Sequence, residues 1–369
     1  MDKRQNINNF NIFKGLGLGF IFIITASALL ALLSHVEYIR NLFEDLFYLW
    51  ISYNFGDALH YMNGFKALIT GNFHEVIAQS PVLHALPGMG IAYLINLISR
   101  DAFVTYGILL IVYNLASVFV WYKVVRSLLI VKSKPIAIFL SILLVAFLHI
   151  NGFYTLYVFE KKPAIIIVGL SILWLIKHFP SPHKTFRSYT PYFLSTILIG
   201  LFHTYTMLIW FGVMIGLSIY NLICSYNQKN FKKSLGIVLA SGLAVLLWAI
   251  VWQIIESYIG GETLHEARER ISIIKGLLFT DVGRNIIIKA ILIALLIAIL
   301  ILIKILINRR IYKSPNCKLR LEYAFILGYT ISTLFVFHST LTMTTLQNFH
   351  FVDFSNSFLI LMLLVALIN

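Results

Sequence analysis

A carboxylate and an imidazole lie one helical turn apart in the stretch NFGDALHYMNGF, at Asp57 and His60. Side chains of these two types are the ones that proteins commonly use to move protons near neutral pH. If Asn54 caps a helix, Asp57 and His60 fall on one helical face together with Gly64. We therefore treat Asp57 and His60 as candidate catalytic residues.

The rest of this stretch predicts what the helix does. Ala58, Met62, Phe65 and Ile69 recur at helical spacing on the opposite face, which predicts an amphipathic helix with its carboxylate towards water or a cleft. Asp57 also lies in the first turn, where a carboxylate caps a helix and interacts favourably with its dipole. Spacing alone leaves both interpretations open.

A second polar cluster consists of Glu160, Lys161 and Lys162, directly before Pro163. Proline is favoured at the first position of a helix. Two cations beside a helix N-terminus attract an anionic phosphate, because the free backbone N–H groups there add to the lysine charges. The alternative is that both lysines extend to the phosphates of membrane lipids.

A third cluster lies in the polar segment 256–285, where charges alternate over HEARER. Arg268 and Arg270 are candidate phosphate-binding residues in this segment, which could bend at Gly260–Gly261 and close over a substrate. Alternating charges are also typical of a solvated helix, here with Glu266 pairing with Arg270.

Two histidines beside apolar segments complete the candidates. His203 lies in GLFHTYTM, and His350 lies in QNFHFVDF together with Asp353. Polar side chains in a membrane are costly, so they mark possible substrate contacts. A histidine bonded to a backbone carbonyl is the equally simple alternative for each.

The composition places all these clusters in a membrane protein. Hydrophobic residues make up 59% of the 369-residue chain and charged residues only 12%, far from the averages of soluble proteins. Apolar runs of roughly 17–25 residues recur, which is the length that crosses a bilayer as a helix. The sequence contains no P-loop, Gly-rich dinucleotide turn, HExxH or CxxC motif, so soluble-nucleotide and zinc chemistries have no support.

We predict an all-α polytopic membrane protein with about ten transmembrane helices, forming a single transmembrane domain over 1–369. The apolar block 192–225 is too long for one crossing and should break near 203–206. The proline- and glycine-containing segment 80–99 is predicted to stay on one side, so the first outer loop, 35–101, holds juxtamembrane amphipathic helices. The predicted crossings are 15–34, 102–122, 135–150, 164–178, 192–203, 206–225, 235–255, 286–307, 321–338 and 354–368.

The positive charges orient these crossings. With 80–99 outside, 19 of the 29 Lys and Arg residues fall in predicted cytoplasmic segments and nine in outer ones. Both termini are then cytoplasmic, in a multi-pass protein of the cell membrane. The net charge of +14 follows mainly from this asymmetry and from attraction to anionic membrane lipids, so no nucleic-acid partner is expected.

The order of elements resembles the C-fold (GT-C) membrane glycosyltransferases. The resemblance rests on one crossing followed by an outer loop with an acid in xGDAxxYxxxFxxxxxGNF, on FEKKPA before a crossing, on LIGLFHTYTML, and on a long outer loop before the eighth crossing. Many members of that superfamily have paired acids in the first loop, where this chain has the single Asp57. The GLFHTYTML and QNFHFVDF stretches also resemble the O-antigen and exopolysaccharide polymerases.

The resemblance implies transfer of a sugar from a polyprenyl-phosphate donor to a glycan, lipid or protein acceptor on the extracytoplasmic side. Asp57 would be the base, with His60 and Glu160 as further catalytic candidates. Lys161, Lys162, Arg268 and Arg270 would hold the phosphate, with His203 and His350 as further substrate-binding candidates. No cofactor is firmly implied, although a divalent metal is possible, and its ligands are unknown.

A lipid-linked glycan flippase or transporter is the competing class. Transporters usually place charges near the bilayer midplane and often show paired halves. The predicted crossings hold few charges and the halves do not match. The position of the essential charges discriminates the two classes, since outer loops favour a transferase and mid-membrane positions favour transport.

Overall fold

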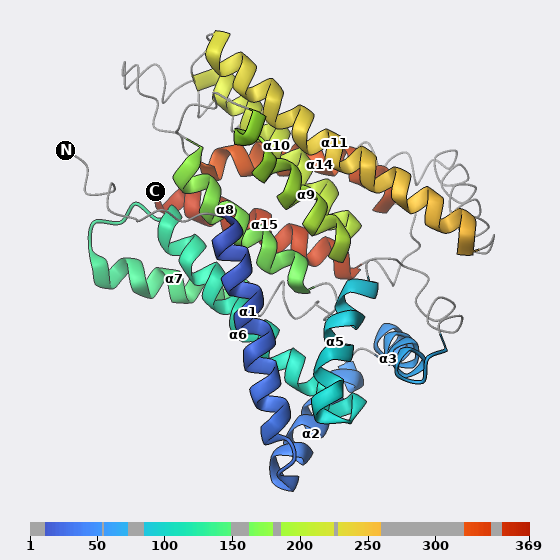
Figure 1. The fold of residues 1–369 in the computed structure, drawn as a ribbon. Helices are drawn as coiled ribbons and strands as arrows, with labels where there is room; N and C mark the ends of the chain where they lie inside the picture. The colour runs from blue at the N-terminus through green and yellow to red at the C-terminus, as the bar shows by residue number, and fades with distance from the viewer. Residues whose placement is uncertain are drawn as a thin grey trace, which may run out of the picture. The chain divides into compact units, whose positions relative to one another are not determined.

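The computed structural model describes residues 12–53, 55–72, 85–148, 162–179, 186–224, 228–259, 321–340 and 349–369 (Figure 1). Within these ranges the chain forms twelve α-helices and one short 3-10 helix, and it contains no strand. The helices are α1 (Ile12–Leu33), α2 (Glu37–Tyr53), α3 (Phe55–Ile69), α5 (Ala85–Ser99), α6 (Ala102–Leu128), α7 (Lys134–Leu148), α8 (Lys162–His178), α9 (Thr190–Phe202), α10 (Thr204–Cys224), α11 (Gln228–Ile259), α14 (Leu321–Thr340) and α15 (Phe349–Ile368), and the 3-10 helix is η4 (Phe186–Ser188).

Three of these helices are long and apolar enough to cross a membrane: α6 over its whole length, α10 over Thr206–Ile223 and α11 over Gln228–Val251. Shorter apolar helical stretches occur in α1, α5, α7, α9 and α15. The helical character of the described residues and the three membrane-length apolar helices agree with the prediction of a helical membrane protein. Ten crossings stay a prediction, and the predicted crossing 286–307 lies outside the described residues.

Prolines mark where several helices begin. Pro87, Pro135, Pro163 and Pro191 each lie in the first turn of their helix, in α5, α7, α8 and α9 respectively. A proline in the first turn loses no helical hydrogen bond, and its fixed φ favours the helix.

The predicted break in the long apolar block is confirmed. α9 ends at Phe202 and α10 begins at Thr204, with His203 between them. The block therefore forms two helices.

The chain groups into two compact units. The first comprises residues 1–127, 156–179 and 201–203, and so contains α1, α2, α3, α5, α8 and all but the last residue of α6. The second comprises residues 128–155, 180–200 and 204–369, with α7, α10, α11, α14, α15 and most of α9. The prediction of one transmembrane domain is not tested by this grouping.

In the second unit α10 and α14 pack backbone against backbone. A Cβ added at Gly216 would overlap the backbone of Gly328, and one added at Gly328 would overlap Val213 and the carbonyl of Gly212. Small residues at a crossing let membrane helices approach this closely, which gains van der Waals contact.

Polar side chains join α10 to α11 as an antiparallel pair. The amide of Asn221, near the end of α10, donates to the hydroxyl of Ser234, near the start of α11, at 3.0 Å. At the other end of the pair the indole N–H of Trp248 donates to the hydroxyl of Thr204 at 3.1 Å. These bonds fix the register of the pair.

The side chain of Asn369 brings three helix ends together in the same unit. Its Oδ1 accepts the backbone N–H of Ile130 at 2.7 Å, and its Nδ2 donates to the carbonyl of Leu128 at 3.0 Å and to Glu322 at 3.2 Å. The end of α6, the start of α14 and the end of α15 therefore meet. The predicted topology requires these ends on one side of the membrane; which side that is stays a prediction.

Candidate functional site

The candidate base lies in α3. Asp57 and His60 are both in α3, one turn apart as predicted, although their side chains lie outside what the structure describes. The helix ends at Ile69 and is followed by Gly71, whose φ of 76° and whose N–H bond to the carbonyl of Leu68 are typical of a Schellman C-cap. Asn54 and residues 73–84 of the predicted first outer loop, including Glu75, are outside the described ranges.

The buried face of α3 agrees only in part with the sequence. Met62 and Phe65 are buried as predicted, but Ile69 is 37% exposed. Gly64, predicted on the polar face, is buried as well. The residues that α3 buries differ from the predicted apolar face because the helix packs against both α2 and α5 and not against a single surface.

Two aromatic residues at the start of α6 contact both α2 and α3. Phe103 stacks on Tyr48 of α2 with ring centroids 5.6 Å apart, and the ammonium of Lys66 of α3 lies 4.6 Å from the centroid of Phe103. Tyr106 meets Phe47 of α2 at 6.0 Å and Phe65 of α3 at 5.0 Å. The first turns of α6 therefore support both α2 and α3, the helix that carries Asp57.

The backbones of α2 and α6 also approach closely in this support. A Cβ at Gly107 would overlap the carbonyl oxygen of Phe43, which is itself buried. Any larger residue at Gly107 would push α2 away from α6.

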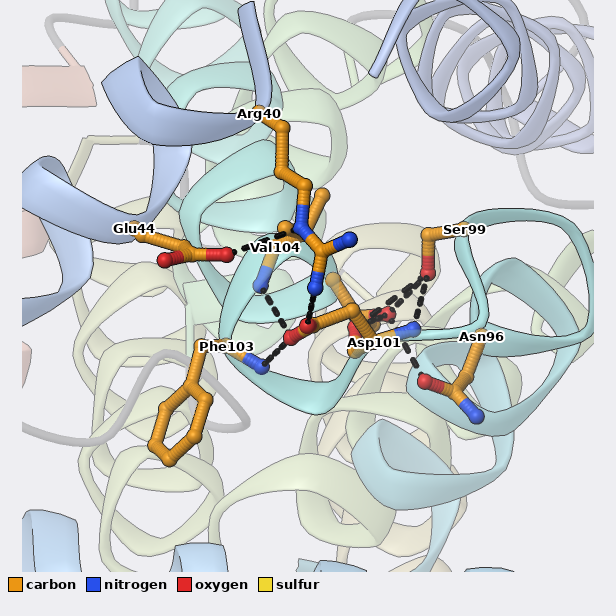
Figure 2. Close-up of polar contacts among 8 residues, drawn as sticks. Arg40, Glu44, Asn96, Ser99, Asp101, Phe103 and Val104 are labelled. Carbon is orange, nitrogen blue, oxygen red and sulfur yellow. Dashed lines mark hydrogen bonds and ion pairs between the residues drawn. The ribbon is translucent and has the colours of Figure 1, made fainter. Parts of the chain in front are cut away.

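Arg40 links α2 to the first residues of α6 (Figure 2). Its Nη2 donates to Oδ2 of Asp101 at 2.6 Å, and its Nε donates to Glu44 at 3.0 Å. The hydrogen bond to Glu44 and the charge of Asp101 raise the pKa of Arg40, so the guanidinium stays charged. Sequence reasoning missed this group, although Arg40 and Glu44 have the i,i+4 spacing of a helical ion pair.

Asp101 uses its second carboxylate oxygen to cap α6. Oδ1 accepts the backbone N–H groups of Phe103 at 2.8 Å and Val104 at 3.2 Å, which is the bonding of an N-cap residue (Figure 2). One carboxylate thus fixes the first turn of α6 and holds Arg40. An acid directly before an apolar helix is the sequence signal that could have identified it.

A small hydroxyl network stiffens the corner between α5 and α6. The hydroxyl of Thr105 lies 2.6 Å from that of Ser99 and 3.2 Å from Oδ1 of Asn96. Arg100 adopts a left-handed φ of 57° at this corner, and its N–H bonds to the carbonyl of Asn96 at 2.8 Å. The sharp reversal between the two helices is therefore set by local hydrogen bonds.

Lys162 lies inside the first unit. Its side chain belongs to the first residue of α8, is only 3% exposed, and donates from Nζ to Oδ1 of Asn114 at 2.7 Å. Its side chain is therefore packed inside the protein, and the predicted position at the outer mouth of a crossing stays a prediction. The ammonium turns inward because Asn114 of α6 offers it an acceptor among apolar residues.

The position of Lys162 along α6 follows from the packing of α8. Gly169 of α8 lies against Val120 and Trp121 of α6, and Lys162 lies against Asn114, so the two helices run parallel in one register. Asn114 is about 18 Å along a helix of about 40 Å at 1.5 Å per residue. Lys162 therefore lies level with the middle of α6.

The remaining candidates are only partly described. His203, which follows α9 and precedes α10 in the chain, is buried. His350 and Asp353 belong to the first turns of α15, and their side chains are outside what the structure describes. Glu160, Lys161, Arg268 and Arg270 lie outside the described ranges. No group of three or more His, Cys, Asp or Glu side chains able to hold a metal gathers among the described residues, so the metal ligands stay unassigned.

Comparison with known protein families, with curated proteins and with solved structures finds no match to this chain.

Proposed function

We propose that this protein is a membrane glycosyltransferase that transfers a sugar from a polyprenyl-phosphate donor to a glycan, lipid or protein acceptor outside the cytoplasm. The observation that carries the proposal is the helix with Asp57 and His60, which directly follows α2 and is anchored on the start of α6. An apolar helix, α1, precedes this arrangement. That order of elements is the one expected from the resemblance to C-fold enzymes.

In the proposed reaction Asp57 is the general base. Its carboxylate takes the proton of the acceptor hydroxyl as the acceptor oxygen bonds to the anomeric carbon. The bond from that carbon to the phosphate oxygen breaks, and its electron pair leaves with the polyprenyl phosphate. A general base typically contributes about 10²–10⁴-fold to a rate, provided it is held at the reacting hydroxyl. The contacts of Phe65 and Lys66 with α6 support this role, because they fix the helix that carries Asp57.

Lysine and arginine side chains are proposed to bind the leaving phosphate. Charged donors placed where negative charge develops are worth far more in a water-excluded site than in water. Lys161, Arg268 and Arg270 are proposed for this role from the sequence. Lys162 is buried against Asn114, so it reaches the phosphate only if that group enters the first unit.

A polysaccharide polymerase of the O-antigen or exopolysaccharide type is a variant of the same proposal. Its donor would carry a growing glycan, and its product would form a ladder of repeats. His203 and His350 are the candidates that the resemblance to such polymerases emphasises. The burial of His203 and the position of His350 in the first turn of α15 are compatible with either variant.

Transport of a lipid-linked glycan is the second candidate, and Lys162 favours it. A lysine level with the middle of α6 is where transporters place charges that meet their cargo. The two candidates differ in chemistry, because a transporter leaves the sugar-phosphate bond intact.

Mass analysis of lipid-linked glycans in cells with and without the gene tests the proposal. For a transferase, loss of the gene should accumulate the polyprenyl-phosphate sugar and remove one sugar, or the repeat ladder, from the product. Reconstitution of the purified protein with that donor should then release free polyprenyl phosphate. Movement of the intact donor across the bilayer, without release of polyprenyl phosphate, would establish transport and overturn the proposal.

A further inference from the structure

Arg40, on the exposed side of α2, contacts the start of α6, on which α3 packs. Arg40 and Asp101 are 61 residues apart in the chain and 2.6 Å apart in space. The Asp101 side chain is 16% exposed and the Arg40 side chain is 52% exposed. Most fully exposed ion pairs contribute little, but this one engages a largely buried carboxylate that also caps a helix.

Phe103 carries the effect of this pair to α3. Its N–H is bound by Asp101, and its ring contacts both Tyr48 of α2 and Lys66 of α3. A shift of the first turn of α6 would therefore move the surfaces on which both helices rest. Asp57 lies two to three turns from Lys66 on the same helix.

We propose that the Arg40–Asp101 ion pair is a positioning device that holds α2 and α3, and with them Asp57, in place on the start of α6. Arg40 and Asp101 are positioning residues in this account, because they act through Phe103 and the helix contacts. The catalytic part of the inference rests on the proposed function, whereas the structural part does not.

Two substitutions separate the ion pair from the cap. Asp101→Asn removes the charge but keeps a side chain that caps helices as well as aspartate does. Arg40→Gln removes the same pair from the other partner. Glu44→Gln is the matched control, since it removes the charge of the local i,i+4 partner of Arg40 but leaves Asp101 untouched.

Backbone hydrogen exchange of the full chain in detergent micelles measures the structural part. Exchange over residues 55–69 should become about two- to fivefold faster in Arg40→Gln and in Asp101→Asn, as expected for loss of one ion pair. The double variant should be no faster than either single one, because both remove the same contact. Glu44→Gln should match the wild type. Unchanged exchange over 55–69 in both single variants, or equal effects in Glu44→Gln, would overturn the inference.

A transfer assay with the polyprenyl-phosphate sugar measures the catalytic part. Arg40→Gln should lower kcat roughly tenfold with little change in the donor KM, because a displaced base costs rate and not donor affinity. Arg40→Lys keeps a cation within reach of Asp101 and should recover most of the lost kcat. This variant also replaces Arg40→Gln in the assay if Arg40→Gln folds poorly. A normal kcat in Arg40→Gln would overturn the catalytic part. If wild-type protein shows no transfer while the exchange results hold, the proposed function fails and the positioning of α3 stands.

Discussion

Nζ of Lys162 donates a hydrogen bond of 2.7 Å to Oδ1 of Asn114, level with the middle of α6. Among the described residues this neutral amide is the partner of a lysine that is 3% exposed, and no carboxylate pairs with it there. Burying a cation is costly unless it is paired or hydrogen-bonded, so this contact should matter for stability.

Loss of the acceptor alone should destabilise the protein. Asn114→Leu leaves the Lys162 ammonium without its described partner, which typically costs about 1–3 kcal/mol. The double variant Asn114→Leu with Lys162→Met replaces both polar groups by apolar ones and should recover near-wild-type stability, because such replacements are often neutral. Thermal unfolding in detergent measures both. A double variant as unstable as Asn114→Leu would show that the pair does not set stability.

The same double variant tests whether Lys162 also meets the donor phosphate. If it does, the stable double variant should use the polyprenyl-phosphate donor at least about tenfold less well, since a charged hydrogen bond contributes about 1.5–3 kcal/mol. Steady-state transfer at varied donor concentration measures this loss. Wild-type donor dependence in the folded double variant would assign Lys162 a purely structural role.

The close approach of α10 and α14 should not tolerate a methyl group. Gly328→Ala would place a Cβ against backbone atoms that cannot rotate away, so we expect a loss of about 1–3 kcal/mol. Gly242→Ala is the matched control, because its Cβ would meet the ring of Phe211 at an ordinary 3.5 Å. Melting temperatures of both variants check this, and equal tolerance at the two positions would contradict the backbone contact.

The predicted topology can be read with single cysteines in a chain whose native cysteines are replaced by serine. Cysteines at Ser133, between α6 and α7, and at Ser314 should be shielded from a membrane-impermeant thiol reagent in intact cells. Cysteines at Ser80 and Thr263 should react. All but Ser133 lie outside the described residues. Labelling of position 133 from outside would mean that segment 80–99 crosses the membrane.

The sequence predicted the helical class and the break at His203 because both depend on local properties: apolar length and the limit that a bilayer sets on one crossing. The sequence predicted membrane crossings and not helix ends. The predicted crossing 235–255 lies within α11, which begins at Gln228 and so includes Lys232 and Lys233. Hydropathy shows where a chain leaves the apolar region, whereas a helix continues through charged residues that favour it.

The candidate site depends on contacts between distant segments, which a single sequence does not show. Asn114 is visible as a polar residue in an apolar run, but its partner lies 48 residues away. Arg40 and Asp101 were missed for the same reason. Asp57 could be placed on a helix from local spacing alone, and that prediction agrees with α3.

The central claim is that Asp57 is the base for glycosyl transfer, and the most direct test is the transfer rate of purified Asp57→Asn. Asn keeps the shape and capping ability of Asp but cannot accept a proton at neutral pH. The free energy of unfolding of the variant should stay within about 1 kcal/mol of the wild-type value. Its transfer rate should fall by about 10²–10⁴-fold. Asp57→Glu should recover little, and His60→Ala should be milder. Near-normal transfer by a folded Asp57→Asn would make Asp57 a helix cap and contradict the account.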